Sequence, residues 1–181
     1  MVFIQMVTLM WSGNPGIEMY RGKKVLVAGG TGTIGIPVVN KLLDSGAEVS
    51  VVSMDTPQFA KLIWTNSVDF KRLDLTSLDN CLKATKGQDF VFNLVGMKGS
   101  VGIGETKVAD YFVKMLLYQT NLMEASFRNS VSRFLFVSSI CGYPQSTAPK
   151  KEDTMWDGIP KQDDRFPGLA KRIGEIQGET Y

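Results

Sequence analysis

Residues 24–35 read KVLVAGGTGTIG, and this stretch decides the fold that the sequence predicts. After Lys24, residues 25–28 are apolar and rich in valine, which is typical of a parallel strand buried on both faces. Glycines follow at once, and over about 33–45 apolar residues recur at helical spacing until Gly46 ends the pattern. The stretch therefore predicts a strand, a tight turn and a helix in direct succession.

The rest of the chain continues this alternation of strand and helix. A second valine-rich run at 49–53 completes a βαβ unit, whose crossover should be right-handed. Further strands are predicted near 68–73, at 90–95 and at 134–137, and further helices near 77–85, 108–128 and 167–179. This order predicts an α/β fold, a Rossmann-type doubly wound parallel sheet with helices on both faces. A ligand should bind at the carboxyl ends of its strands.

Length and composition are those of one globular domain. The chain has 181 residues, of which 44% are hydrophobic and 21% charged, which excludes a disordered tail, a collagen-like repeat or a coiled coil. Residues 1–11 are apolar, but they lack a basic start and fall short of the roughly 20 residues that a membrane-spanning helix needs. We expect an N-terminal extension over 1–20, one domain over 21–181, and no membrane partner.

Charge and residue usage exclude several classes of function. The net charge of +2, with Lys and Arg spread along the chain, gives no electrostatic footprint for nucleic acid. The chain contains no histidine, which removes the commonest metal ligand and the base of Ser-His-Asp chemistry, so no metal site is predicted. Its two cysteines, Cys81 and Cys141, are too few for a disulfide framework and favour a cytoplasmic location.

The glycines at 29, 32 and 35 have the spacing G-x-x-G-x-x-G between the first strand and the first helix. Positions without a side chain allow a tight turn, let the backbone approach a pyrophosphate and pack the helix close to the sheet. The pyrophosphate charge then meets the positive end of the helix dipole. We therefore predict a dinucleotide site that includes Gly29, Gly32, Thr33, Ile34 and Gly35. The alternative is a tight turn that binds nothing.

The end of the second strand bears on the choice of cofactor. A carboxylate there accepts hydrogen bonds from the ribose 2′-hydroxyl of NAD, whereas NADP sites leave room and supply a cation. Ser53 stands at the strand end and Asp55 two residues beyond it, with no arginine beside them in the sequence. Asp55 favours NAD and the small Ser53 permits NADP, so we expect NAD or NADP with a slight preference for NAD. In the alternative interpretation, Asp55 caps the following helix.

With these motifs in place, the chain from about Lys23 to Tyr181 resembles the extended short-chain dehydrogenase/reductase family, the NAD(P)-dependent nucleotide-sugar epimerases, dehydratases and reductases. Within that family it looks most like the GDP-L-fucose synthase branch. The segments that carry the resemblance are GGTGTIG at 29–35, RLDLTS at 72–77, VFNLVG at 91–96, MKGSVGIG at 97–104, NLMEA at 121–125, RFLFVSSICGYP at 133–144 and AKRIGEIQGETY at 170–181.

The resemblance implies further residues at the cofactor. Asp74 and Leu75 match the residues that hold the adenine in the family. Leu94, Val95 and Gly96 match the small apolar segment beside the cofactor ribose. These five positions extend the cofactor site that we expect, to which Lys171 also belongs.

The resemblance also implies three residues at the reacting centre. Ser139 matches the serine that hydrogen-bonds the substrate oxygen, and Cys141 matches the cysteine that takes part in proton transfer in fucose synthases. Lys171 matches the lysine that binds the nicotinamide ribose and lowers the pKa of the catalytic tyrosine. The alternatives are structural: Ser139 satisfies backbone groups at a strand end, Cys141 is a small buried residue, and Lys171 is a solvated helix residue.

The chain departs from the family pattern at two positions. The catalytic tyrosine is replaced by Pro167, preceded by Phe166, so no phenolic hydroxyl is available there. An asparagine of the active site is replaced by Met115. General acid–base catalysis typically contributes about 10²–10⁴-fold in rate, so we expect weak or no turnover from this chain.

These observations lead to one principal hypothesis and two alternatives. The principal hypothesis is the NAD(P)-binding portion of a nucleotide-sugar epimerase, dehydratase or reductase, without the family's C-terminal substrate domain. Its partners would be a nucleotide sugar and, as the family implies, a second copy bound through the long helix and the last helix. The alternatives are a non-catalytic dinucleotide-binding or redox-sensing protein, favoured by the missing tyrosine, and the product of a truncated gene.

Overall fold

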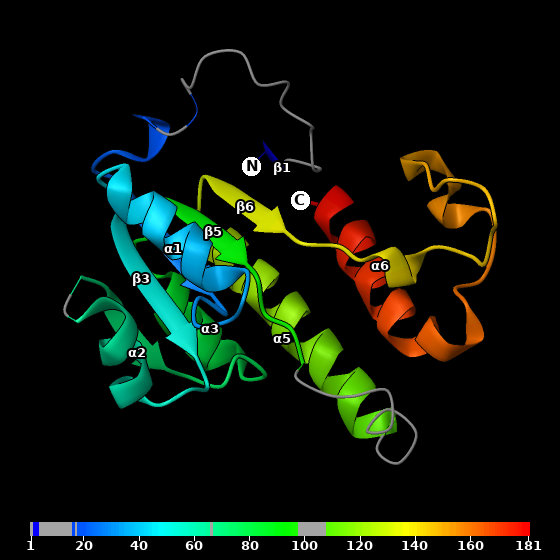
Figure 1. The fold of residues 1–181 in the computed structure, drawn as a ribbon, viewed down its shortest axis with the longest axis horizontal. Helices are drawn as coiled ribbons and strands as arrows, with labels where there is room; N and C mark the ends of the chain where they lie inside the picture. The colour runs from blue at the N-terminus through cyan, green and yellow to red at the C-terminus, as the bar shows by residue number, and fades with distance from the viewer. Residues whose placement is uncertain (1, 4–15, 17, 66, 98–107) are drawn as a thin grey trace.

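The computed structural model describes residues 2–3, 16, 18–65, 67–97 and 108–181, in which strands and helices alternate (Figure 1). The strands are β1 (Val2–Phe3), β2 (Lys24–Ala28), β3 (Glu48–Ser53), β4 (Asp69–Arg72), β5 (Phe90–Asn93) and β6 (Arg133–Phe136). The α-helices are α1 (Gly35–Asp44), α2 (Pro57–Trp64), α3 (Leu78–Thr85), α5 (Val108–Arg128) and α6 (Arg165–Glu179). The 3₁₀-helices are η1 (Glu18–Tyr20), η2 (Ile140–Gly142), η3 (Glu152–Trp156) and η4 (Gln162–Asp164).

The strands form one sheet in the order β1-β6-β5-β2-β3-β4, and every neighbouring pair is parallel. The chain proceeds from β2 outward to β3 and β4, and then crosses back to β5 and β6 on the other side of β2. The carboxyl end of β2 is therefore the point where the strand order reverses, which is where open α/β sheets bind ligands. This topology confirms the predicted Rossmann-type doubly wound sheet.

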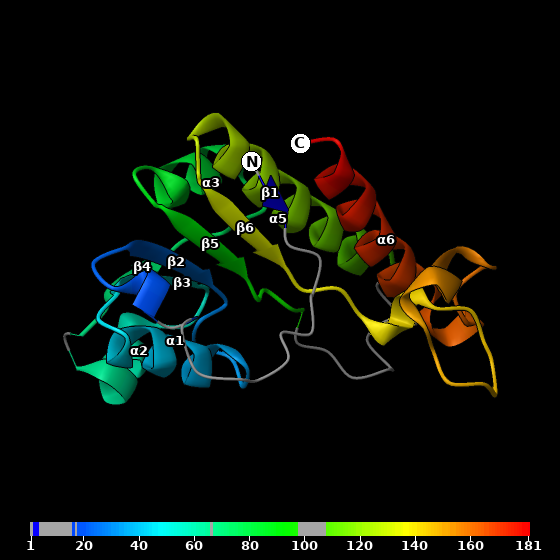
Figure 2. The ribbon, with the colours of Figure 1, turned by 90° about the horizontal axis from the view of Figure 1, so that it is seen from above.

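Helices cover both faces of the sheet (Figure 2). Helices α1 and α2 lie on one face, and α3, α5 and α6 lie on the other. The side chains of β2 alternate between the two layers: Val25 and Val27 join the cluster under α1 and α2, whereas Leu26 and Ala28 join the cluster under α3 and α5. All four are fully buried, as the uninterrupted apolar run predicts for a central parallel strand.

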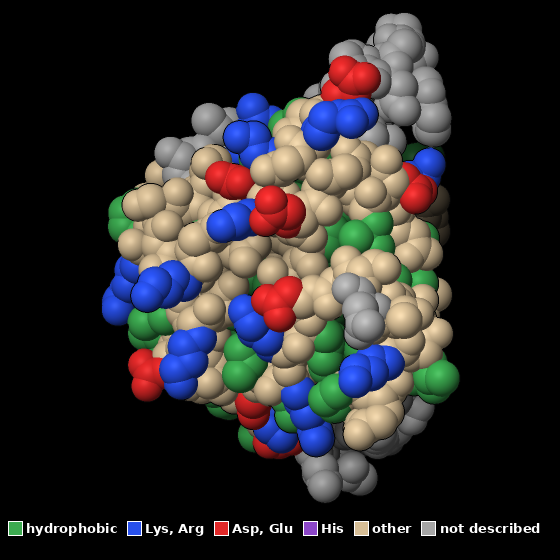
Figure 3. All heavy atoms as spheres, turned by 90° about the vertical axis from the view of Figure 1, so that its left-hand side faces the viewer, with side chains coloured by type: hydrophobic (Ala, Val, Ile, Leu, Met, Phe, Trp, Pro, Cys, Tyr) green, Lys and Arg blue, Asp and Glu red, His purple; other side chains and the backbone are tan. Residues whose placement is uncertain are grey.

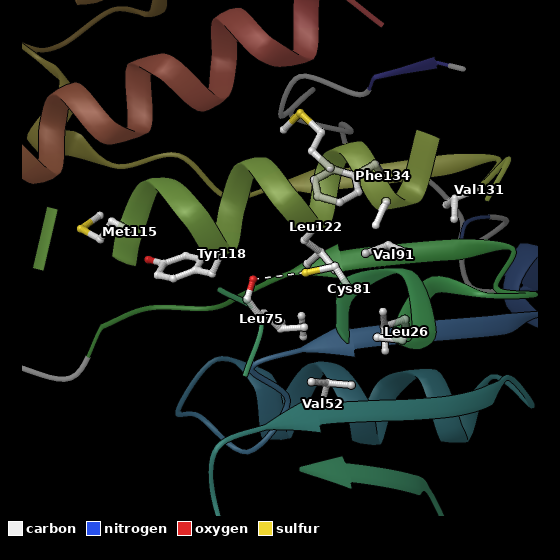
Figure 4. Packing of buried hydrophobic residues seen from close by; sticks show 14 of the residues in the cluster. Leu26, Val52, Leu75, Cys81, Val91, Met115, Tyr118, Leu122, Val131 and Phe134 are labelled. Carbon is white, nitrogen blue, oxygen red and sulfur yellow. Dashed lines mark hydrogen bonds between the residues drawn. The ribbon is translucent and has the colours of Figure 1, made fainter. Parts of the chain in front are cut away.

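The larger cluster packs the sheet against α3 and α5 (Figure 4). Leu26 and Val91 from the strands lie in it together with Leu122 of α5. Full burial of an aliphatic side chain contributes about 1.5–3 kcal/mol, so this layer holds α5 firmly against the sheet. Cys81 is part of the same core: its thiol donates to the Leu75 carbonyl at 3.2 Å, and burial raises the pKa of the Cys81 thiol to about 12. That cysteine is structural.

Helix α2 decides between the two interpretations of Asp55. The residue that caps α2 is Thr56, whose hydroxyl accepts a hydrogen bond from the Phe59 amide at 3.3 Å. Pro57 follows at the first helical position, where its fixed φ suits the start of a helix. The interpretation of Asp55 as the helix cap is therefore wrong, because the neighbouring threonine takes that position.

Parts of residues 1–20 contact the sheet. Strand β1 pairs with β6 at the edge of the sheet, with Val2 opposite Arg133 and Phe3 opposite Phe134. The Tyr20 ring, at the end of η1, packs edge-on against the Phe90 ring at 5.4 Å between centroids. The separation of this segment as an extension from the domain at 21–181 stays a prediction.

The surface of the molecule carries mixed charge. On the side that lies at the left of Figure 1, lysine and arginine side chains are interspersed with aspartate and glutamate side chains (Figure 3). Among the residues that the structure describes, no helix is both long enough and apolar enough to cross a membrane.

Candidate functional site

The glycine turn after β2 is closed so tightly that three of its four glycines, Gly29, Gly30 and Gly35, have no room for a side chain. Gly29 has a φ of +79°, which favours glycine, and its amide donates to the Val52 carbonyl at 2.8 Å. A Cβ on Gly35 would lie 2.3 Å from the Gly29 oxygen. A Cβ on Gly32, by contrast, would have only the Gly29 oxygen, at 3.3 Å, within 4 Å. Gly29 and Gly35 thus shape the turn, and Gly32 leaves open backbone above it.

Helix α1 starts directly from this turn. Its N-cap is Ile34, whose side chain makes no capping hydrogen bond, and both Thr33 and Ile34 are exposed. The positive end of the helix dipole therefore faces a turn that a ligand can reach from solvent. This arrangement suits a diphosphate.

A hydroxyl–carboxylate cluster joins the glycine turn to the end of β3. The Thr31 hydroxyl donates to Asp55 Oδ2 at 2.6 Å. Ser53 Oγ lies 2.7 Å from Thr31 Oγ1 and 3.1 Å from Asp55 Oδ2, and it accepts from the Asp55 amide at 3.0 Å. The structure thus brings the predicted residues Ser53 and Asp55 together, and it adds the buried Thr31, which the sequence analysis did not single out.

An arginine lies beside this cluster in the fold, although no arginine is adjacent to Ser53 or Asp55 along the sequence. The pairing of β3 with β4 places Arg72 opposite Ser53. Arg72 Nε donates to the Met54 carbonyl at 3.1 Å, which fixes the base of the guanidinium next to the segment that leads to Asp55. The signal was present in the RLDLTS segment, but only the strand register shows which residues Arg72 lies against.

The segment after β5 lies against the glycine turn, as the cofactor prediction requires. The Leu94 amide donates to the Ala28 carbonyl at 2.9 Å, and the Leu94 oxygen would be 2.8 Å from a Cβ on Gly29. The Val95 amide donates to Asn93 Oδ1 at 3.3 Å, which holds the start of this segment, and the exposed Gly96 follows it. Leu94 and Val95 therefore border the turn directly.

Asp74 and Leu75 lie at the end of β4 and make mainly local contacts. Asp74 Oδ1 accepts from the amide and the hydroxyl of Thr76 at 2.9 and 2.8 Å. The Leu75 side chain is buried in the core under α3 and α5. An adenine would therefore meet the Leu75 backbone or the exposed Asp74, not the Leu75 side chain.

A second group of predicted residues follows β6. Ser139 Oγ accepts from the Cys141 amide at 3.2 Å, so this serine caps η2. Cys141 is a half-buried free thiol. Helix α6 packs so closely on this turn that a Cβ on Gly168 would lie 2.1 Å from the Cys141 oxygen. The glycine at 168 is thus what lets α6 approach the turn that carries Ser139 and Cys141.

Lys171 extends from α6 to the end of β6. Its ammonium donates to the Val137 carbonyl at 2.8 Å and lies 4.8 Å from the centre of the Phe136 ring. Burial lowers the pKa of Lys171 to about 8, although the nearby Cys141 and Glu175 act in the opposite direction. Glu175 in turn accepts a hydrogen bond from the Ser138 hydroxyl. Lys171 is thus a desolvated cation at the strand end and not a solvated helix residue.

The lowered pKa of Lys171 predicts a specific dependence of stability on pH. Between about pH 8 and the ordinary lysine value of 10.5, the unfolded chain binds more protons at this residue than the folded chain does. Lys171 therefore makes stability rise with pH in that window. We expect the free energy of unfolding of the wild type, measured relative to that of Lys171→Met, to increase as the pH rises from 8 to 10.5. Urea unfolding at four pH values tests this, and parallel curves for the two proteins would contradict it.

The two positions that depart from the family pattern, 166–167 and 115, also have apolar surroundings in the fold. Phe166 packs edge-on against Phe112 of α5, with 5.8 Å between ring centroids, and Pro167 follows it in the first turn of α6. Met115 is only 4% exposed and belongs to the core. Tyr111, on the first turn of α5, does lie in this region: burial raises its pKa, and the nearby Cys141 raises it further.

Comparison with known proteins assigns the family. A family model described as the NAD dependent epimerase/dehydratase family matches residues 25–178. The chain belongs to this family. Among curated epimerase/dehydratase relatives, GDP-mannose 3,5-epimerase 1 of Oryza sativa subsp. japonica is 33% identical over 118 residues, which are 62% of this chain and 30% of that protein. GDP-L-fucose synthase of Sinorhizobium fredii is 28% identical over 163 residues, which are 88% of this chain and 47% of that protein. The chain thus spans less than half the length of these relatives.

Solved structures of the epimerase/dehydratase type share the fold. A GDP-D-glycero-L-gluco-heptose synthase from Campylobacter jejuni, solved in the presence of NADPH, has a TM-score of 0.71 and 26% identity, covering 88% of this chain and 44% of that one. MoeE5 in complex with UDP-glucose and NAD has a TM-score of 0.70 and 29% identity, covering 87% of this chain and 48% of that one. The similar structures therefore include one solved with each of the two nicotinamide cofactors.

Proposed function

We propose that this chain is the dinucleotide-binding portion of a nucleotide-sugar epimerase, dehydratase or reductase. The observation that carries the proposal is the closed glycine turn at the point where the strand order reverses. Gly32 leaves the backbone of that turn open, and the start of α1 adds a positive dipole end. The pyrophosphate of NAD or NADP would lie there, next to Thr33 and Ile34. Leu94, Val95 and Gly96 would border the ribose on the nicotinamide side.

The groups after β6 define what the chain could do to a substrate. When bound, the reduced cofactor supplies a hydride to a keto carbon of the sugar. Ser139 would donate a hydrogen bond to the oxygen on that carbon, and Lys171 would hold the nicotinamide ribose. Cys141, the half-buried free thiol beside Ser139, would move a proton. The similarity to a GDP-L-fucose synthase supports a GDP-linked sugar as the class of substrate.

We infer that turnover by this chain is weak or absent. Phe166 and Pro167 bring no hydroxyl to the start of α6, and the buried Met115 replaces a polar side chain. The same observation favours a second function, a non-catalytic dinucleotide-binding or redox-sensing protein that keeps the glycine turn without acid–base chemistry. Both functions share the cofactor site and differ in whether a keto sugar is reduced.

Exposed apolar residues support a homodimer as part of the proposal. Val113 and Leu117 on α5 are 49% and 39% exposed, and Ile173 and Ile176 on α6 are 40% and 47% exposed. The two helices pack side by side in the structure, so a second copy would bury these faces together. The two free cysteines support a reducing, cytoplasmic location.

Calorimetric titration of the chain with NAD, NADH, NADP and NADPH tests the cofactor site. We expect micromolar binding of at least one nucleotide, and loss of that binding in Gly32→Val, because a side chain at 32 would occupy the open backbone of the turn. Circular dichroism of the variant serves as the control for folding. If the folded wild-type chain binds none of the four nucleotides, the glycine turn is only a structural turn and the proposal fails.

An assay of the reaction separates the two functions. We expect no robust NADPH-dependent reduction of a GDP-4-keto-6-deoxy sugar, measured by the loss of NADPH absorbance. Rapid turnover by the wild-type chain would contradict the inference of weak activity. It would also assign the missing proton donor to a group other than positions 166 and 167.

A further inference from the structure

Helix α6 lies beside the segment of chain that leaves β6 (Figure 1). Two of its side chains bind consecutive residues of that segment. Lys171 donates to the Val137 carbonyl at 2.8 Å, and Glu175 accepts from the Ser138 hydroxyl. We propose that Glu175, fixed by Ser138, is a positioning residue for Lys171, whose ammonium it keeps at the end of β6. The inference deepens the proposed function and rests on it for the role of Lys171 at the nicotinamide ribose.

Gly174 lets the helix approach the strand end closely enough for these contacts. A Cβ at this position would lie 2.4 Å from Cζ of the Phe136 ring, so a side chain here would push the ring or the helix away. The Lys171 ammonium lies 4.8 Å from the centre of the same ring. Three consecutive residues, 136–138, are thus held against one face of α6.

The Ser138 hydroxyl determines where the Glu175 carboxylate lies. Glu175 follows Lys171 by four residues, a spacing that puts both side chains on one face of the helix. A glutamate at such a position on an exposed helix face would extend into water. Here Ser138 donates to the carboxylate, and a hydrogen bond to an ionised group is stronger than one between neutral groups. The negative charge is therefore fixed at the end of β6, one helical turn from Lys171.

Glu175 supplies a charge that opposes the effect of burial on Lys171. Burial lowers the pKa of Lys171 to about 8, whereas Cys141 and Glu175 act to raise it. Cys141 lies on η2 and Glu175 on α6, so each of these elements brings one ionisable group to the ammonium. A carboxylate is ordinarily charged at neutral pH and a thiol is not. Glu175 is also close to Tyr143: burial raises the pKa of this phenol, and the Glu175 charge raises it further.

The first test measures the titration of Lys171 in the full chain without cofactor. Trace acetylation by acetic anhydride, followed at Lys171 by mass spectrometry between pH 6 and pH 10, reports the neutral amine. Glu175→Gln keeps an oxygen that can accept from Ser138 but removes the charge, so the pKa of Lys171 should fall further. An opposite charge near the surface changes such an equilibrium by up to about fivefold. We expect Lys171 of the variant to be acetylated about two- to fivefold faster at pH 7.

Glu179→Gln is the matched control. It removes the same charge from the same helix, one turn further from Lys171, and Glu179 is exposed. The acetylation rate of Lys171 in this variant should equal that of the wild type. Glu175→Asp keeps the charge on a shorter side chain and should restore a rate close to the wild-type value. A merely structural role of Glu175 would lower stability in urea without moving the pH profile of acetylation.

The second test connects Glu175 to the cofactor. The full chain is titrated calorimetrically between pH 6 and pH 9 with NAD, or with NADP if it binds that nucleotide more tightly. A charged ammonium donates stronger hydrogen bonds to ribose hydroxyls than a neutral amine does. Affinity should therefore fall as the pH passes the pKa of Lys171, which is about 8 in the wild type. In Glu175→Gln the fall should occur at a lower pH.

The two tests separate the inference from the proposed function. If Lys171 is acetylated at the wild-type rate in Glu175→Gln, or if Glu179→Gln raises the rate as much, the inference fails whatever the cofactor does. If the wild type binds a dinucleotide but the pH at which affinity falls is the same in Glu175→Gln, the inference fails and the cofactor site stands. If the folded wild type binds no dinucleotide, the proposed function fails together with the cofactor role of Glu175, and only the effect of its charge on Lys171 stands.

Discussion

Replacing Gly35 with alanine should prevent the glycine turn from closing and destabilise the whole domain. The added Cβ would lie 2.3 Å from the Gly29 oxygen and 2.5 Å from the Gly30 oxygen, and both of these atoms are backbone. Neither can rotate away as a flexible side chain would. Overpacking in a core typically costs about 1–3 kcal/mol of stability. A clash with two backbone carbonyl oxygens should cost an amount at or above the upper end of that range. We expect a loss of about 3 kcal/mol or more in urea unfolding.

The matched variant is Gly32→Ala, three residues earlier in the same turn. There the Cβ would approach only the Gly29 oxygen, at 3.3 Å, so the fold should survive with a loss of less than about 1 kcal/mol. Cofactor binding should nevertheless fall sharply, because the methyl group covers backbone that the pyrophosphate needs. If Gly35→Ala is as stable as Gly32→Ala, the two glycines do not have the separate roles that the geometry gives them.

Much of the fold is predictable because its strongest signals are local. The helix expected at 108–128 is observed as Val108–Arg128, since apolar residues recur at helical spacing along its whole length. The strand expected at 24–28 is observed with the same bounds, because a continuous apolar run between polar and glycine residues leaves little choice. Helix α6 begins at Arg165, two residues earlier than expected. Helix ends depend on local contacts that apolar periodicity does not record.

The parts of the site that sequence reasoning missed depend on register and long-range packing. Arg72 lies beside Ser53 only because β3 and β4 pair in one particular register. Thr31 stands between glycines in the sequence, and only the fold brings its hydroxyl to the Asp55 carboxylate. The polar segment at 140–164 contains three 3₁₀-helices. Such short helices have no apolar periodicity that a sequence reader could use.

The polar segment between β6 and α6 is organised around the buried side chain of Arg172. Arg172 is 7% exposed, and its guanidinium reaches across three turns of the chain. Nε donates to the Gly142 carbonyl at 2.7 Å, and Nη2 donates to the Gly158 carbonyl at 2.7 Å and to the Met155 carbonyl. One planar, forked cation thus ties η2 and the segment around η3 to α6. Cys141 lies in η2, and Lys171 directly precedes Arg172 in α6. The Arg172 side chain therefore holds these two proposed reacting groups together.

Arg172→Met should therefore be among the most destabilising substitutions in the chain. Methionine has a similar length, but it leaves buried carbonyl oxygens without donors, each at a cost of about 1–3 kcal/mol. We expect a loss of about 3 kcal/mol or more in urea unfolding, and faster proteolytic cleavage within residues 143–164. The stability of Arg172→Lys should lie between that of the wild type and that of Arg172→Met. A single ammonium keeps the charge, but it cannot reach all the carbonyl oxygens that the guanidinium binds.

Arg165→Met provides the comparison that isolates burial. Arg165 is exposed at the first residue of the same helix, and surface substitutions usually change stability by less than about 0.5 kcal/mol. The loss in Arg172→Met should exceed the loss in Arg165→Met several-fold, and only Arg172→Met should expose the 143–164 segment to protease. Equal stability of the two variants would mean that other contacts, such as the packing of Gly168 on the Cys141 turn, hold this segment without the guanidinium.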